Sequence, residues 1–316
     1  MTTAVAVALY NGARFLETQL DSLRLQSRTP DRVVRCDDGS TDGTADLVAA
    51  YIAKHGLGET WELSRNPENL GYIRNFYRAI SLCDADLIFL SDQDDVWKSD
   101  KIEKMTAVME ANPHISLLSC RYGIIDAAGE EPHRLVGGSA NEDGGLEPVT
   151  VQTIMTAYRW PGMLMCLRKD FFDTLLPAIA ESPVPHDLMF ATCAADRDSF
   201  YEYHYLGAYH RRHDNNVAKE EHRIFKLLDL QRKLTDIART RKHWTVLLHE
   251  STPIGESSRR IIAERLALHE KREKALRDRS LSQILRLYRE DKGVLLRKSS
   301  LVCDVWLVCF GKYKNN

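Results

Sequence analysis

Strand-like and helix-like patterns alternate along the first half of the chain. Short apolar runs bounded by turn residues, such as Ala4–Leu9 before Tyr-Asn-Gly, predict buried strands. Longer segments such as Phe15–Gln26 carry apolar residues at helical spacing. The expected strands are 4–9, 32–36, 60–65, 86–90 and 115–120, and the expected helices are 15–26, 45–56, 75–83 and 98–112. This alternation predicts an α/β fold with a mostly parallel central sheet flanked by helices.

The pattern becomes helical and charged in the last third of the chain. Two helical stretches, 222–250 and 257–290, are separated by the turn residues Ser251–Gly255. A chain of 316 residues with 44% hydrophobic residues can bury the core of one large domain and still carry an appendage. We therefore expect residues 1–216 to form the α/β domain and residues 217–316 to form a helical, basic C-terminal region.

The two regions carry opposite charge. Met1–Asn216 holds 20 Lys and Arg against 32 Asp and Glu, whereas Val217–Asn316 holds 23 against 13. Within the basic region, Lys271–Arg297 is followed by the apolar Leu301–Phe310, which is too short to span a bilayer as one helix. Basic residues beside an apolar segment that contains Trp306 suit the surface of an anionic membrane. A helical appendage packed on the α/β domain or on a second subunit explains the pattern equally well.

Cysteine usage and the start of the chain indicate a reduced compartment. The seven cysteines are scattered, odd in number and form no Cys-x-x-Cys pair, so neither a zinc knuckle nor a disulfide framework is predicted. The first residues, Met1–Asn11, have only a brief apolar run and lack the basic residues of a signal peptide. We expect a cytoplasmic protein. Nucleic acid is not an expected partner, because no recognisable reading motif accompanies the basic tail.

Two acidic motifs follow predicted strands. In the first, Asp37–Asp42 (DDGSTD), either Asp37 or Asp38 can accept hydrogen bonds from a base or a ribose. The last three residues of this motif also suit the N-cap of the next helix, but a cap does not explain two consecutive acids at the end of a strand. Ligands of parallel sheets gather at the carboxyl ends of strands, where this motif falls.

The second acidic motif is Ser91–Asp95 (SDQDD). Carboxylates on alternate residues of an extended segment point to the same side, so Asp92 and Asp94 can converge on one ligand. Oxygen ligands favour Mg²⁺ or Mn²⁺, which usually keep substrate phosphates in their coordination shell and can neutralise a departing diphosphate. A solvated acidic turn is the alternative interpretation of this motif.

Two further segments carry candidate chemistry. In PVPHDLMF a helix pattern starts close to Asp187, and a helix N-terminus favours the ionised carboxylate that a general base requires. A simple N-cap explains Asp187 equally well. In YHRRHDNN, His210 and His213 lack enough further ligands nearby for a structural zinc site.

Seven stretches together resemble the family-two glycosyltransferases, and within them the bacterial rhamnosyltransferase-like group. They occur in the family order and cover about Thr3 to Val217. The matching stretches are ALYNGARFLETQLDSLRLQ, DDGSTDGT, NPENLGYIRNF, FLSDQDDVWKSDKIEKM, WPGMLMC, PHDLMF and YHRRHDNN. Each stretch alone is weakly specific, whereas the ordered set is highly specific.

The resemblance implies an A-type nucleotide-diphosphosugar transferase fold and an inverting, metal-dependent transfer that uses Mn²⁺ or Mg²⁺. It assigns binding of the nucleotide and the metal to residues of the first, second, fourth and last matching motifs. The nucleotide-binding residues would be Tyr10, Asn11, Asp37, Asp38 and Asp92, and the metal ligands would be Asp94 and His213.

The same resemblance assigns the catalytic and supporting roles. Asp187 would act as base on the acceptor hydroxyl, and Asp95, His186 and Met163 would support the site. Met163 belongs to the stretch that usually lines the acceptor side. The family often has an aromatic residue after the His-Asp pair, whereas Leu188 stands here, which puts the acceptor contacts in doubt rather than the chemistry.

By this likeness, the protein would transfer a sugar, with rhamnose indicated by the subgroup, in cell-surface polysaccharide assembly. The donor would be a dTDP or UDP sugar, and the acceptor a glycan or a lipid-linked glycan. The expected place is the cytoplasm, with peripheral attachment to the inner face of the plasma membrane. The long helices after Val217 leave a homo-oligomer open.

Three alternatives compete with this interpretation. D-Q-D-D-V also fits the Asp-x-Asp-x-Val motif of haloacid-dehalogenase-type phosphatases, but that motif normally follows the first strand of its domain. A nucleotidyltransferase would need a glycine-rich, basic loop after the first strand, which ALYNGARF does not provide. A non-catalytic module that binds a sugar nucleotide would show binding without hydrolysis or transfer.

Overall fold

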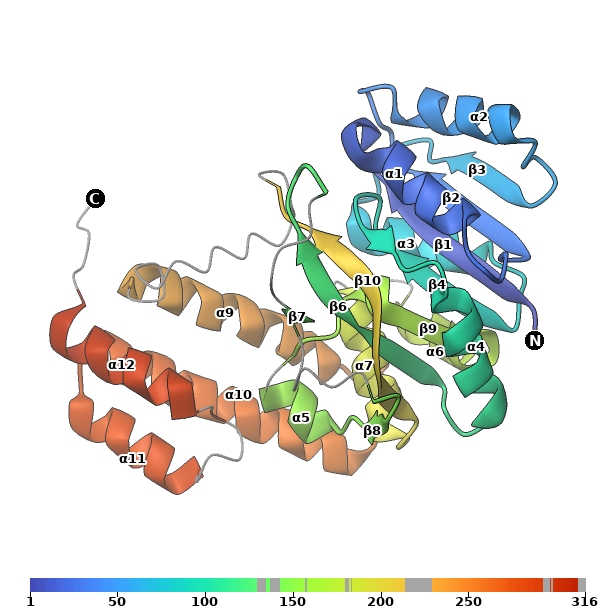
Figure 1. Ribbon diagram of the computed structural model, residues 1–316. Coiled ribbons are helices and arrows are strands. Elements are labelled where there is room, and N and C mark those ends of the chain that lie inside the picture. Colours follow the sequence, from blue (N-terminus) through green and yellow to red (C-terminus); the bar gives the residue numbers. More distant parts are fainter. Residues whose placement is uncertain are drawn as a thin grey trace. The chain divides into compact units, whose positions relative to one another are not determined.

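The computed structural model describes residues 1–129, 135–136, 143–156, 158–179, 182, 184–213, 229–291, 296 and 298–311 (Figure 1). The chain divides into two compact units. The first unit comprises Met1–Val149, Arg159–Glu181 and Pro185–Asp214, and the second comprises Thr150–Tyr158, Ser182–Val184 and Asn215–Asn316. The boundary predicted after residue 216 therefore falls two residues from the last boundary between the units. The assignment of Thr150–Tyr158 and Ser182–Val184 to the second unit was not predicted.

The first unit is built on one mixed sheet with the strand order β3-β2-β1-β4-β9-β6-β10-β5, in which β7 also pairs with β6 and β8 with β10. Its strands are β1 (Thr3–Leu9), β2 (Arg32–Asp37), β3 (Trp61–Arg65), β4 (Leu87–Ser91), β5 (Val96–Trp97), β6 (Leu117–Ile125), β7 (Leu135–Val136), β8 (Leu146–Pro148), β9 (Met165–Arg168) and β10 (Phe200–Arg211). Strands β3, β2, β1 and β4 are parallel, as are β6 and β10, and the antiparallel β9 joins the two groups. The mostly parallel sheet predicted from the sequence is confirmed.

Strand register brings the polar motifs to one edge of this sheet. Leu9 at the end of β1 pairs with Asp37 at the end of β2, and Val7 pairs with Ser91 at the end of β4. Because β9 is antiparallel to both β4 and β6, and β10 is parallel to β6, the end of β10 at Arg211 points to the same edge. The carboxyl ends of strands in open α/β sheets are where ligands usually bind.

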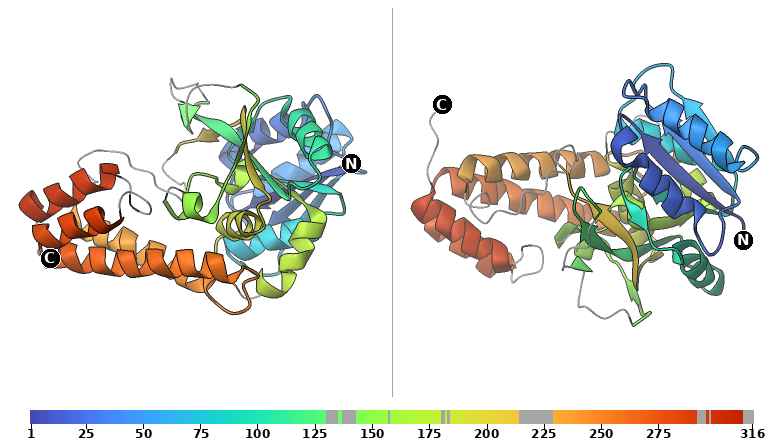
Figure 2. Two further views of the ribbon diagram at one scale, coloured as in Figure 1. Left: turned by 90° about the horizontal axis from the view of Figure 1, so that it is seen from below. Right: turned by 45° about the horizontal axis from the view of Figure 1, so that its top comes forward.

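Helices cover both faces of the sheet. The helices of this unit are α1 (Ala13–Arg24), α2 (Thr44–His55), α3 (Tyr72–Ser81), α4 (Lys101–Ala111), α6 (Lys169–Ile179) and α7 (His186–Asp196), with the short 3₁₀ helix η1 (Gly162–Leu164) before β9. Buried residues of α1, α2 and α4 share one core with Val5, Val7 and Leu9 of β1. Helix α3 packs on β1 and β2. Successive side chains of β1 point to opposite faces of the sheet, so β1 contributes to the core on both faces. Helices α3, α6 and α7 lie on the side of the sheet opposite α1 and α2 (Figures 1 and 2).

The second unit is helical, as predicted for the C-terminal region. It contains α5 (Val151–Thr156), α9 (Leu230–Leu247), α10 (Glu256–Arg277), α11 (Leu281–Asp291) and α12 (Lys298–Phe310). Buried apolar side chains from α9, α10, α11 and α12 form its own core. None of the helices in the described part of the chain is long and apolar enough to cross a membrane.

The stretch predicted as continuously helical from 257 to 290 is in fact two helices. Helix α10 ends at Arg277, Arg279 adopts a left-handed φ of 49°, and α11 begins at Leu281. No apolar residue lies between Leu276 and Leu281, so this short charged segment offers nothing to bury and can turn in solvent.

Candidate functional site

Acids from one segment and histidines from another meet at the carboxyl edge of the sheet. Asp94 and Asp95 follow β4, whereas His210 lies near the end of β10 and His213 just after it. His213 Nε2 lies 2.8 Å from Asp94 Oδ2, and His210 Nδ1 lies 3.0 Å from Asp95 Oδ1. The backbone N–H of Arg211 also donates to Asp95 Oδ1, at 3.0 Å. Two consecutive acids are thus each paired with a histidine.

Crowding of carboxylates changes the pKa values in this acidic cluster. Burial and the charges of Asp95 and Asp94 raise the pKa of Asp92 well above that of an ordinary aspartate. Burial and Asp95 also raise the pKa of Asp94, although the hydrogen bond with His213 opposes the shift. Burial lowers the pKa of His210, but its hydrogen bond with Asp95 and the neighbouring carboxylates outweigh burial and raise the value to about 9. The cluster therefore favours added positive charge.

Unsatisfied oxygens in the cluster fit a divalent cation. Asp95 Oδ2 is buried and accepts no hydrogen bond. Within the described part of the chain, no group donates a hydrogen bond to the Asp92 carboxylate. Carboxylate oxygens are the ligands that Mg²⁺ and Mn²⁺ prefer in proteins. Asp92 and Asp94, with His213 beside them, are therefore the residues that could hold such an ion.

Asp37 and Asp38 have different partners despite being adjacent. Both oxygens of Asp38 accept backbone N–H groups of the loop between β3 and α3, from Leu70 to Oδ1 and from Gly71 to Oδ2, each at 2.8 Å. Asn66 Nδ2 also donates to Asp38 Oδ1, at 2.7 Å. Asp37 Oδ1, in contrast, is buried and has no hydrogen-bond partner. Asp38 therefore holds a loop in place, and Asp37 keeps the acceptor that could meet a nucleoside.

Tyr10 and Asn11 lie in the loop after β1 at the same edge. The Tyr10 side chain is 51% exposed, so its ring is available to stack on a base. Asn11 adopts a positive φ of 48°, and its side-chain oxygen accepts the N–H of Thr41 at 2.9 Å. Asn11 therefore ties its own loop to the one that follows Asp38.

The capping role that the sequence offered as an alternative for the end of the DDGSTD motif is replaced by a second link between these loops. The N-cap residue of α2 is Gly43, which makes no side-chain cap. Asp42 Oδ2 accepts the N–H of Ala13, and its Oδ1 accepts the N–H of Thr44, both at 3.1 Å. Burial opposes ionisation of Asp42, but a hydrogen bond from the Thr44 hydroxyl, together with these N–H groups, outweighs burial and lowers the pKa of Asp42.

Gln93 connects the acidic cluster to the loop after β1, and sequence reasoning missed it. Its Oε1 accepts the N–H of Tyr10 at 2.8 Å, and its Nε2 donates to the Tyr10 carbonyl at 2.9 Å. A Cβ atom at Gly12 would lie 2.3 Å from Gln93 Oε1, so the glycine leaves room for the amide. The residue between the two acids of Asp-x-Asp thus fixes where the acids stand relative to Tyr10.

Asp187 lies in the first turn of α7 rather than at its N-cap, which is Pro185. Its Oδ1 accepts the N–H of Leu188 at 2.8 Å, and the side chain is half-buried. Its charge adds to burial and to the nearby acids in raising the pKa of Asp92, and it adds to burial in raising the pKa of Tyr77. Asp187 therefore lies within electrostatic reach of the acidic cluster, as expected of a base that acts on an acceptor hydroxyl beside a bound donor.

The ring of His186, the residue before Asp187, packs among aromatic side chains. Its imidazole is 5% exposed, and neither ring nitrogen has a hydrogen-bond partner. The ring stacks on Phe76 with 4.1 Å between centroids, and a Cβ atom at Gly162 would lie 2.5 Å from its Nε2. Burial lowers the pKa of His186, so the ring packs in its neutral form. The supporting role expected of His186 stays a prediction.

The Met163 side chain is fully buried in the core, so it cannot itself line an open acceptor site. Its carbonyl accepts a hydrogen bond from Lys101 Nζ at 2.6 Å. Lys101 is also fully buried, lies 3.6 Å from the ring centroid of Trp97, and has its pKa lowered by burial to about 8. Met163 therefore contributes core packing and an acceptor for Lys101, a buried cation on which the charges of Asp95 and Asp92 act and which sequence reasoning missed. The supporting role of Met163 stays a prediction.

A further group with ligand-like spacing lies on β8 and β10. Ligand atoms of Glu147, Glu202 and His204 all lie within 4.8 Å of one another. Glu202, however, already accepts hydrogen bonds from Arg121 at 3.0 Å and from Trp160 Nε1 at 2.6 Å. Because these donors satisfy the central carboxylate, we assign no ion to this group.

Comparison with known proteins identifies a family and several relatives. The sequence model of the family described as "Glycosyl transferase family 2" matches residues 4–172, which is more than half of the chain. The dTDP-rhamnosyl transferase RfbG of Shigella flexneri is 35% identical over 100 residues, covering 31% of this chain and 34% of that protein. The chain spans about half the length, or less, of the curated relatives it matches.

Solved structures share the fold. TarS from S. aureus in complex with UDP superposes with a TM-score of 0.60 at 15% identity, covering 100% of this chain and 93% of that chain. The mannosyltransferase PcManGT from Pyrobaculum calidifontis, in complex with GDP-Man and Mn²⁺, gives a TM-score of 0.50 at 17% identity, covering 97% of this chain and 84% of that chain. At these identities the likeness shows the A-type fold.

Proposed function

Because the chain belongs to glycosyl transferase family 2, we propose that it is an inverting, metal-dependent glycosyltransferase of cell-surface polysaccharide assembly. It would move a sugar from a nucleotide-diphosphate donor to a glycan acceptor. The observation that supports this best is the convergence of two kinds of group on one sheet edge. Asp37 offers a buried, unpartnered acceptor for a base, and Asp92 and Asp94 form an acidic cluster for a metal-bound diphosphate.

The proposed reaction is a single displacement. Asp187 takes the proton of an acceptor hydroxyl while the hydroxyl oxygen attacks the anomeric carbon, and the bond from that carbon to the diphosphate oxygen breaks. The nucleoside diphosphate leaves from the opposite face, which inverts the configuration. A divalent ion held by Asp92, Asp94 and His213 would neutralise the charge on the leaving diphosphate.

The donor and the acceptor are proposed from the relatives. A dTDP or UDP sugar is the proposed donor, since RfbG is a dTDP-rhamnosyl transferase and TarS is solved with UDP. Rhamnose is the first sugar to test. A glycan or lipid-linked glycan is the proposed acceptor. Cytoplasmic location is supported by the seven cysteines, all of which are free.

A donor panel tests this function. The purified protein with Mn²⁺ should release nucleoside diphosphate from one of dTDP-rhamnose, UDP-glucose, UDP-N-acetylglucosamine and GDP-mannose, and excess chelator should stop the release. Release of phosphate from a phosphomonoester instead would support the dehalogenase-type phosphatase. That alternative is not favoured, because Asp92 follows the fourth strand of the chain rather than the first. Binding of a donor with no turnover under any condition would support the non-catalytic module.

Removal of the Gln93 side chain should weaken donor binding. In Gln93→Ala, both hydrogen bonds to Tyr10 are lost, so the loop that carries Tyr10 and the loop that carries the acids can move independently. At about 1 kcal/mol for each bond, the KM for the donor should rise roughly tenfold or more. The midpoint of thermal unfolding should change little, because both hydrogen bonds lie in exposed loops.

Gly12→Ala provides a second route to the same defect, since its Cβ would occupy the place of the Gln93 amide while its φ of −110° is allowed for alanine. The two substitutions together should raise KM no more than Gln93→Ala alone, because they break one contact. Gly58→Ala is the matched control, because a Cβ there meets nothing within 4 Å. Additive effects of Gly12→Ala and Gln93→Ala would contradict the proposed link.

A further inference from the structure

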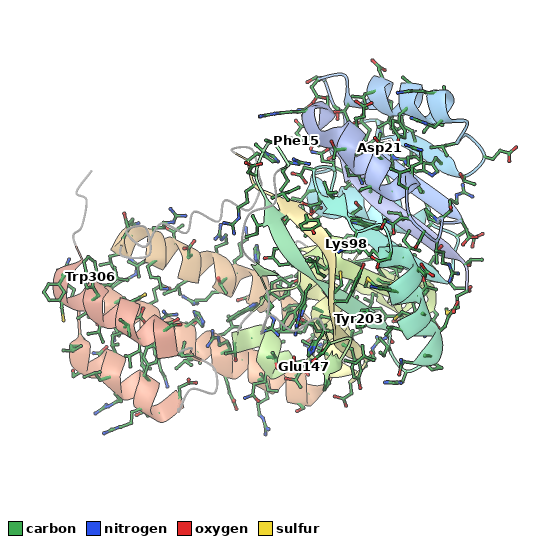
Figure 3. The ribbon with its side chains drawn as sticks, in the orientation of Figure 1. Phe15, Asp21, Lys98, Glu147, Tyr203 and Trp306 are labelled. Carbon is green, nitrogen blue, oxygen red and sulfur yellow. The ribbon has the colours of Figure 1, made fainter. Side chains whose placement is uncertain are left out.

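Helix α12 exposes a row of large apolar side chains. Val302, Trp306 and Phe310 follow one another at the four-residue spacing of a helix face and are 71%, 37% and 67% exposed. The rings of Trp306 and Phe310 lie 6.1 Å apart. Figure 3 shows the Trp306 side chain projecting outward from α12. We call these three residues the α12 apolar face.

The acidic side chain of α12, Asp304, is buried, whereas an ordinary surface helix turns its charged side chains to solvent. Asp304 is the only charged residue between 299 and 311, and it is fully buried. Arg272 donates to it from Nε at 2.6 Å and from a terminal nitrogen at 2.9 Å, and the Tyr288 hydroxyl donates at 2.9 Å. A surface helix normally turns its polar residues to water. Over residues 299–310, where the side chains of α12 are described, its exposed side instead carries no charged residue.

Cationic side chains lie at the end of α12 and on its neighbouring helix α11. A terminal nitrogen of Arg279 donates to the carbonyl of Gly311, which places a guanidinium at the Phe310 end of α12. Arg286 and Arg289 are exposed on α11, which packs on α12. Arg272, one of the cations counted in the basic segment of the sequence, is buried in its ion pair and adds nothing to the surface. Even so, residues 217–316 hold 23 Lys and Arg against 13 Asp and Glu.

We propose that the α12 apolar face docks on an anionic lipid surface. Exposed Trp and Phe suit the region of lipid head groups, and the exposed arginines of α11 are attracted to anionic lipids. A second copy of the chain fits the face less well, because two such contacts would bring two positively charged units together. The proposal does not depend on the transferase reaction, so its failure would leave the proposed function untouched.

Flotation of the full chain with vesicles tests the docking surface. At low salt, the protein should float with vesicles of equal parts phosphatidylglycerol and phosphatidylcholine, and much less with phosphatidylcholine alone. Val302→Ser with Phe310→Ser removes two exposed apolar side chains without touching the core, and should lower vesicle binding about tenfold or more. Leu25→Ser, which changes a leucine that is 59% exposed in the first unit, is the matched control and should float like the wild type.

A second variant tests the electrostatic part. Arg286→Glu with Arg289→Glu should lower binding to the anionic vesicles, and added salt should lower binding of the wild type in the same way. Absence of flotation by the wild type, or equal flotation of the wild type and the Val302/Phe310 variant, would overturn the proposal. A dimer in sedimentation that the Val302/Phe310 variant loses, without vesicle binding by either protein, would also overturn it and would assign the face to a second copy.

Discussion

Replacing Asp94 with alanine is expected to abolish both metal-dependent donor turnover and stabilisation of the protein by Mn²⁺, while leaving the metal-free fold intact. Burial and the neighbouring Asp95 already raise the pKa of Asp94, so removing this carboxylate relieves repulsion instead of costing stability. An ion present at about a hundred times its Kd adds about 2.7 kcal/mol to the stability of the wild type. The variant should lose this increment.

Thermal unfolding with and without Mn²⁺ checks the prediction. The metal-free midpoint of Asp94→Ala should equal or exceed that of the wild type, and only the wild type should shift upward when Mn²⁺ is added. Asp84→Ala removes an exposed acid of the first unit, three residues before β4 begins, and should behave like the wild type in both measurements. A preserved Mn²⁺ shift in Asp94→Ala, or full turnover by the wild type in excess chelator, would show that the metal assignment is wrong.

The fold and the edge that carries the site could be predicted because both follow from local periodicity. Each strand of the first half ends at a polar motif, and parallel strands place their carboxyl ends together, so Asp37 and Asp92 had to approach the same edge. The sequence could not show that Asp38 holds a loop while Asp37 keeps an unpartnered oxygen. Successive residues of an extended segment point in opposite directions, and only the loop at Leu70 and Gly71 decides which acid is used internally.

Contacts between distant segments explain most of what the sequence did not reveal. Gln93 binds the backbone of Tyr10. Because every residue type has the same backbone groups, the sequence does not show which residue Gln93 contacts. His210 is an isolated histidine until β10 places it opposite Asp95. The only local trace of the Gln93 contact is Gly12, and glycine after Tyr-Asn is equally typical of an ordinary turn.

The face of helix α12 that is buried also could not be predicted from the sequence. A helical pattern with one acid and several apolar residues predicts that the acid faces water and the apolar residues face a core. Arg272 lies 32 residues before Asp304 in the sequence, and its bidentate contact holds this acid on the buried side of the helix. Leu307 and Val308 are buried as expected, whereas the α12 apolar face is left exposed. Helical periodicity predicts which residues share a face, whereas the tertiary partner decides which face is buried.

Asp187→Asn is expected to retain donor affinity and stability but to lose transfer by about a thousandfold, within the range that general base catalysis usually contributes. Asparagine keeps the oxygen that accepts the N–H of Leu188, so the first turn of α7 should be unchanged. It cannot take the proton of an acceptor hydroxyl. Single-turnover transfer and donor binding, measured on the same preparation, separate these two effects.

Asp170→Asn is the matched control for the effect of removing a carboxylate from the first turn of a helix. Asp170 is the second residue of α6 as Asp187 is of α7, and its Oδ1 accepts the N–H of Phe171 at 2.6 Å in the same manner. Both substitutions remove one negative charge from a helix N-terminus and should therefore cost a similar, small free energy of unfolding. Only Asp187→Asn should affect transfer, because only Asp187 lies within electrostatic reach of Asp92. Equal loss of stability with unchanged turnover in both variants would leave Asp187 a helix-stabilising residue and would require another base.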